Sequence, residues 1–112
     1  MSGDSTAEVT FASLQPNDRL VMETGRSVYT FILTDKANRK GYLVGGNVTQ
    51  PREAVFSGSL LQPDRQLWEG GVRAGARATF FLVVPTEMSG FSQVVTSPLV
   101  RVRLVRAGTS LA

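Results

Sequence analysis

The chain has 112 residues, with 12 Lys and Arg against 9 Asp and Glu, 42% hydrophobic residues and 19% charged residues. This length and balance fit one globular domain and exclude a chain that stays disordered. The sequence contains no cysteine and no histidine, which excludes disulfides, thiolate nucleophiles and histidine-based metal sites or serine triads. Any catalysis would depend on Asp, Glu, Lys, Tyr or Arg.

The N-terminal stretch is small, polar and acidic, and we expect residues 1–9 to form a flexible head. It lacks the basic start and apolar middle of a secretory signal. Ser5 and Glu8 have the spacing of a capping box, so the sequence predicts at most one short helix here. That helix would place Phe11 and Leu14 over one open end of a β-structure.

From residue 18 onward, glycine and proline recur too often for long helices, and the segments between them are rich in β-branched and aromatic residues. Pro98 would mark a bend in the last strand, and Gly45 and Gly46 would supply a bulge or tight turn. Alternation of side-chain character predicts six strands, at residues 18–24, 27–35, 40–46, 52–58, 77–84 and 93–105.

The alternation also predicts which side chains face the interior. Two strands carry apolar residues on the opposite face as well, namely Val28, Ile32, Phe81 and Val83. Either the sheet folds back on itself or a second subunit covers those strands. The expected inward set is Leu20, Met22, Tyr29, Phe31, Leu33, Tyr42, Val44, Phe80, Leu82, Val84, Val100, Val102 and Leu104.

These patterns together predict an all-β protein, a small antiparallel barrel of about six bent strands. The barrel would form a single domain over residues 10–106, followed by a flexible tail at residues 107–112. The longest apolar stretch, residues 80–84, is far shorter than the roughly 18 residues of a membrane-spanning helix. We therefore expect a cytoplasmic protein, with no cofactor, no metal and no membrane contact.

One predicted strand carries a candidate nucleic-acid site. The segment Arg39-Lys40-Gly41-Tyr42 is similar to the nucleic-acid-binding strand of cold-shock and RRM domains, where a basic residue and a glycine precede aromatics that stack on bases. The alternative interpretation is an ordinary hairpin strand.

The last strand carries a second basic feature. Arg101 and Arg103 project from the face opposite Val102, and they form a two-arginine stripe with Arg106 near its end. A phosphate or an acidic partner would bind such a stripe. The alternative is a charged outer face that discourages aggregation and pairs with Glu23 or Glu53.

Three large apolar residues in loop-like segments are candidate partner contacts. Trp68 lies beside two glycines, where its indole either fills the core or serves as a contact anchor. Met88 and Phe91 lie among Ser, Gly and Glu residues, which is typical of an exposed loop tip.

An enzyme built on carboxylates alone would need two acids that converge in a cleft. The candidate acids are dispersed in the sequence. Asp18, Asp35 and Asp64 occupy turn-like positions, whereas Glu23 and Glu53 alternate outward on strands.

A short helix followed by residues 14–20 and bent antiparallel strands resembles the layout of SH3-like and Sm-like small barrels. Gly45-Gly46-Asn47-Val48 is similar to the glycine-asparagine turn of Sm-type RNA-binding proteins. The resemblance implies a small-barrel fold, and its Sm side implies RNA binding, with Asn47 as a contact, and ring assembly.

The leading hypothesis is a non-enzymatic soluble β-barrel module that binds another protein or a second copy of the chain. A small carboxylate-based enzyme is the second alternative. The first alternative is a nucleic-acid-binding barrel whose affinity falls steeply with salt and whose contacts are Arg39, Lys40, Tyr42, Asn47, Arg101 and Arg103.

Overall fold

The computed structural model describes residues 8–83 and 91–108, without the side chain of Phe91, and this part of the chain is all-β. It contains one 3-10 turn, η1 (Phe11–Ser13), and no α-helix. The strands are β1 (Glu8–Thr10), β2 (Arg19–Glu23), β3 (Val28–Asp35), β4 (Lys40–Gly45), β5 (Val48–Leu61), β6 (Gln66–Trp68), β7 (Gly71–Arg73), β8 (Arg77–Val83), β9 (Phe91–Val95) and β10 (Arg101–Val105).

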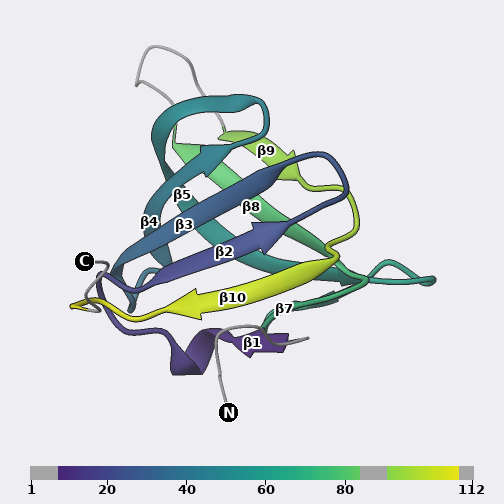
Figure 1. Cartoon of the computed structure of the whole chain (residues 1–112), viewed down its shortest axis with the longest axis horizontal. Coiled ribbons are helices and arrows are strands. Elements are labelled where there is room, and N and C mark those ends of the chain that lie inside the picture. Colours follow the sequence, from purple (N-terminus) through teal and green to yellow (C-terminus); the bar gives the residue numbers. More distant parts are fainter. Residues whose placement is uncertain (1–7, 84–90, 109–112) are drawn as a thin grey trace.

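All pairings between these strands are antiparallel. The main sheet has the order β10-β2-β3-β4-β5-β8-β9, and β6 pairs with the end of β5 beyond the reach of β4. β1 and β7 form a separate two-stranded sheet beside β10 (Figure 1). The predicted all-β, antiparallel class is confirmed.

The main sheet curls because a short link joins its two ends. Residues 96–100 connect β9 to β10, and six steps of extended chain reach about 20 Å. A flat sheet would separate β9 from β10 by six strand spacings, about 29 Å. The two ends therefore approach each other, but no ladder joins β9 to β10 among the described residues.

The link is held at both ends by backbone hydrogen bonds. Its Thr96 N–H donates to Ala78 O at 3.0 Å, and its Val100 N–H donates to Glu23 O at 2.7 Å. Between them, Leu99 is buried in the core.

Four phenylalanines form the centre of the core. Phe56 stacks on Phe11 with ring centroids 5.7 Å apart and lies 5.4 Å from Phe80, while Phe31 lies 5.1 Å from Phe80. The predicted inward positions Leu20, Met22, Phe31, Leu33, Phe80, Leu82 and Val102 are buried, and Tyr29 and Leu104 pack partly against the core. Val84 lies outside the described residues.

The predicted inward phase of β4 is wrong. Tyr42 is 45% exposed, whereas Leu43 is fully buried. The register explains this, because Leu43 lies opposite buried Phe31 and Tyr42 lies opposite half-buried Ile32 on the outer face. Val44 shares the outer face with Tyr42, and the inner face of β4 consists of glycines and one leucine.

Several further expectations differ from the structure, and the predicted last strand at residues 93–105 is two strands, β9 and β10. Val100 is 62% exposed because it lies in the link and β10 begins one residue later. In place of a capped helix, residues 8–10 pair with β7 as strand β1, although Phe11 and Leu14 are buried as expected. Val9, assigned to the flexible head by the sequence, is also buried.

Replacing the central aromatic ring tests this core. Phe56→Ala removes a buried side chain that contacts three other rings, and we expect a loss of about 3–5 kcal/mol in the free energy of unfolding. Tyr42→Ala, on the exposed outer face, should cost less than about 1 kcal/mol. Urea denaturation measures both, and equal losses would contradict the assigned faces of the sheet.

Candidate functional site: an unprotected sheet edge and its cleft

β9 ends the strand order of the main sheet and pairs only with β8 among the described residues. Its residues Ser92, Gln93 and Val95 are exposed. Natural edge strands are usually blunted by charge, proline or a bulge. The sequence of β9, Phe-Ser-Gln-Val-Val, contains no charged residue and no proline, whereas β10 at the other end of the order carries Arg101 and Arg103.

The backbone groups that point away from β8 follow from one hydrogen bond. The Thr96 N–H donates to Ala78 O, so the backbone of Thr96 points toward β8. Successive residues of a strand alternate in this direction. The N–H and C=O groups of Val94 and Ser92 therefore point toward β8, and those of Gln93 and Val95 point outward.

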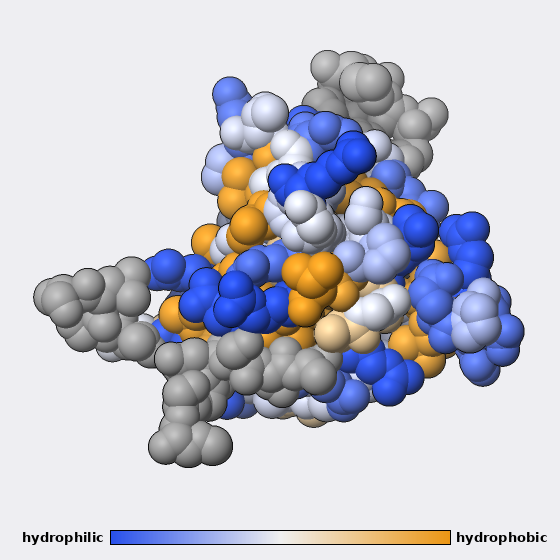
Figure 2. All heavy atoms as spheres, turned by 45° about the vertical axis from the view of Figure 1, so that its right-hand side comes forward, coloured by the Kyte–Doolittle hydropathy of each residue, from blue (hydrophilic) through white to orange (hydrophobic). Residues whose placement is uncertain are grey.

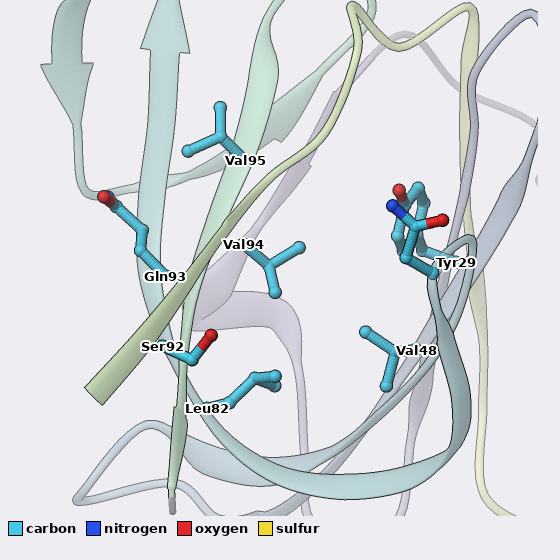
Figure 3. Close-up of a pocket in the computed structure, with 8 residues that line it drawn as sticks. Tyr29, Val48, Leu82, Ser92, Gln93, Val94 and Val95 are labelled. Carbon is cyan, nitrogen blue, oxygen red and sulfur yellow. The ribbon is translucent and has the colours of Figure 1, made fainter. Parts of the chain in front are cut away.

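A cleft of about 350 Å³ lies on the inner side of β9. Val94, Ser92 and Leu82 point across it toward Val48, while Gln93 and Val95 point away (Figure 3). A smaller hollow of about 130 Å³ shares part of this lining and adds Arg52. The cleft is lined by Tyr29, Asn47, Val48, Leu82, Ser92, Gln93, Val94 and Val95.

The opposite wall of the cleft depends on the turn between β4 and β5. The register shifts between Leu43 and Gly45, and Gly45 and Gly46 have φ angles of 128° and 55°, which favour glycine. A Cβ at Gly46 would overlap the ring of Tyr29. The turn therefore packs against Tyr29, and Asn47 and Val48 line the cleft.

Among the described residues, the cleft lining holds no Asp, Glu, Lys or Arg, and the only charged group that the adjoining hollow adds is the Arg52 guanidinium. The described lining therefore holds no carboxylate or amine for proton transfer. It offers apolar side chains with polar groups at the rim, which is chemistry for binding an uncharged side chain.

The carboxyl groups with shifted pKa values are structural. Burial raises the pKa of Asp18, but hydrogen bonds from the backbone of Ala107 and Gln15, and the guanidinium of Arg106, bring it below the usual value. Hydrogen bonds from Asn38 lower the pKa of Asp35. Neither group is a proton donor at neutral pH.

The structure does not bring the six predicted nucleic-acid contacts together. Arg39 covers one end of the core, 4.3 Å from the Phe11 ring centroid and 5.0 Å from that of Phe56. It donates hydrogen bonds to Phe56 O at 3.1 Å and Glu69 O at 2.6 Å. Burial lowers the pKa of Arg39, and Glu69 opposes that effect. Asn47 lines the cleft on the inner side.

The other four lie on the outer face of the main sheet. Lys40 is 3.5 Å from Glu53, and Arg101 is 3.1 Å from Glu23, as the sequence allowed. Arg103 is half-buried, and its Nε has no hydrogen-bond partner. Tyr42 is exposed, on β4, three strands away from β10.

The structure does not bring the three predicted partner contacts together either. Trp68 is half-buried on β6 with the Arg73 guanidinium 5.1 Å from its ring. Met88 lies outside the described residues, and only the backbone of Phe91 is described, as the first residue of β9.

Sequence reasoning missed Ser92, Gln93 and Val94 as site residues. One signal could have found them, because residues 88–100 form the longest uncharged stretch of the chain. An uncharged strand at the edge of a sheet is prone to pair with a strand of another chain.

Within residues 8–83 and 91–108, His, Cys, Asp and Glu form no group of three that could hold a metal ion. No described helix has the length and apolarity to cross a bilayer. Compared with protein-family models, curated proteins and solved structures, the chain gives no significant match. The resemblance to SH3-like and Sm-like barrels stays a prediction.

The structural role of Arg39 can be tested against that of another arginine. Arg39→Met removes the cation–π contacts and two hydrogen bonds, and we expect a loss of about 2–4 kcal/mol in the free energy of unfolding. Arg101→Met removes an exposed ion pair and should cost less than about 1 kcal/mol. Chemical denaturation measures both losses. An Arg39→Met protein as stable as the parent would contradict the structural role and leave Arg39 as a candidate ligand-binding residue.

The Asp18 carboxylate should make stability depend on acid. A carboxyl group whose pKa is lowered by folding stabilises the protein above its unfolded pKa of about 3.9, and that contribution disappears as the pH falls through the folded pKa. We expect Asp18→Asn to cost about 1–3 kcal/mol at pH 7 and to lose less stability than the parent between pH 7 and pH 3. Denaturation at both pH values measures this.

The exposed Asp64 provides the control, because Asp64→Asn removes an acid from a turn without touching the Asp18 contacts. Its acid dependence should match that of the parent. An Asp18→Asn protein that retains the full parental loss at pH 3 would contradict the assignment.

Proposed function

We propose that this protein is a non-enzymatic interaction module that binds an extended polypeptide segment by adding it as a strand to β9. The observation that carries the proposal is the unprotected edge, where Gln93 and Val95 point backbone donors and acceptors outward. Strand addition satisfies such groups with main-chain hydrogen bonds and obtains specificity from pockets for alternate side chains.

The cleft supports the same mode of binding. Ser92 and Val94 face its interior, so an added strand would direct every second side chain to the same side. The uncharged lining favours apolar side chains at those positions. The face drawn in Figure 2 shows hydrophobic atoms in separate groups among hydrophilic ones, so this face offers no broad apolar surface for docking.

Nucleic-acid binding is the second candidate, favoured by the exposure of Tyr42 on the outer face. A base can stack on such a ring, and Arg19 and Arg103 lie on the same face. The ion pairs of Lys40 and Arg101 with acidic residues reduce the positive charge available there.

Selection from a displayed library of random peptides tests the proposal. We expect uncharged, β-prone peptides to be enriched and to bind about tenfold more weakly to Gln93→Pro, since proline removes an outward N–H and leaves the β8 pairing groups intact. Val95→Lys, which places a charge on the same edge, should weaken binding similarly. Leu67→Pro on edge strand β6, which likewise removes an N–H that points away from the neighbouring strand, is the matched control and should bind normally.

Two results would overturn strand addition at β9. Either no peptide is enriched, or the enriched peptides bind the β9 variants as well as the parent. A single-stranded RNA oligonucleotide forms the comparison arm. Salt-sensitive RNA binding that is lost in Tyr42→Ala and retained in Gln93→Pro would favour the second candidate.

A further inference from the structure

We propose that the strand added to β9 is the β9 strand of a second copy of this chain, antiparallel to the first, with the two-fold axis at Gln93. The inference rests on the proposed function, and it names the partner. The two sheets would join into one continuous sheet across the axis.

The backbone directions fit this arrangement. In an isologous pair each residue meets its symmetry counterpart, and Gln93 points its N–H and C=O outward. Two Gln93 residues on the axis would exchange two N–H···O bonds. Val95 would pair with residue 91 of the other copy, which has the same outward direction by alternation. All five residues of β9 are then paired.

The side chains are compatible with their own copies. A charged residue near a two-fold axis meets the same charge, and β9 has none. The Gln93 amide has both donors and an acceptor, so it can bond to a second Gln93. The opposite end of the sheet differs, because antiparallel self-pairing of β10 about Arg103 would place two guanidiniums together.

The inner side of the joined strands would also match. The register about Gln93 places Val94 of the second copy opposite Ser92, which lines the cleft. An apolar side chain would then lie at the cleft rim in each copy. Val94 itself already packs against the core, so the added contact extends an existing apolar surface.

The interface should be weak. A stable dimer usually buries about 1,200–2,000 Å², and one five-residue strand supplies only part of that. We expect a monomer at low concentration and a dimer that forms as the protein concentration rises.

Cysteine cross-linking tests the register, because the chain contains no cysteine of its own. Residues in a hydrogen-bonded antiparallel pair have Cα atoms about 5.5 Å apart, within the range that a disulfide spans. We expect Gln93→Cys to form a disulfide-linked dimer at least tenfold faster than Gln66→Cys, the same substitution on edge strand β6.

Sedimentation of the parent protein provides a test without cysteine. Its average mass should rise from the 12.1 kDa of the monomer toward twice that value with concentration, and Val95→Lys should remain monomeric. Equal cross-linking rates at positions 93 and 66, or a parent that stays monomeric throughout, would overturn the self-pairing.

The two proposals fail in different ways. If the parent stays monomeric while selected peptides bind in a manner sensitive to Val95→Lys, strand addition stands and the second copy is not the partner. If a dimer forms but persists in Val95→Lys, the dimer uses another surface and self-pairing through β9 is wrong.

Discussion

The short link between β9 and β10 is the constraint on which the rest of the structure depends. Because residues 96–100 cannot span a flat sheet of this order, the sheet curls and its inner face becomes concave. The phenylalanines of β3, β5 and β8 then converge with Phe11 from η1. Leu99 places the link itself in this core, so the same segment sets the curvature and helps to fill the interior.

The curl also explains why the two ends of the sheet differ. β10 lies beside the small β1–β7 sheet, and the Asp18 carboxylate binds Arg106 and the Ala107 N–H just after it. This end is therefore covered and charged. Among the described residues, β9 pairs with β8 alone. The fold thus leaves the outward main-chain groups of β9 on a strand that borders the cleft.

The sequence predicted those parts of the fold where apolar and polar residues alternate clearly. In β2 and β3 most of the large apolar side chains occupy one phase, so Leu20, Met22, Phe31 and Leu33 were placed correctly. In β4 the larger side chains, Tyr42 and Val44, lie on the outer face, and the inner positions hold glycines that a hydrophobic pattern cannot detect. Only the pairing with β3 determines that phase.

The short strands β1 and β7 were missed for a related reason. Three residues are too few for a periodic signal, and Val9 and Val72 are buried because the strands pair with each other across the chain. Long-range pairing of this kind is not encoded locally. The same applies to Arg39, whose basic character suggested an anion site but whose position over Phe11 depends on segments far apart in sequence.

The distribution of charged side chains bears on the proposed function in two ways. Several bases of this arginine-rich chain have structural partners: Arg39 covers the core, Arg101 pairs with Glu23 and Arg106 with Asp18. An excess of arginine is therefore weak evidence for a polyanionic ligand here. The longest uncharged stretch of this basic chain includes β9, whose outer edge is open among the described residues. That edge therefore lacks the usual protection against strand pairing. Selection against aggregation would favour a charge there, and the proposed strand addition accounts for its absence.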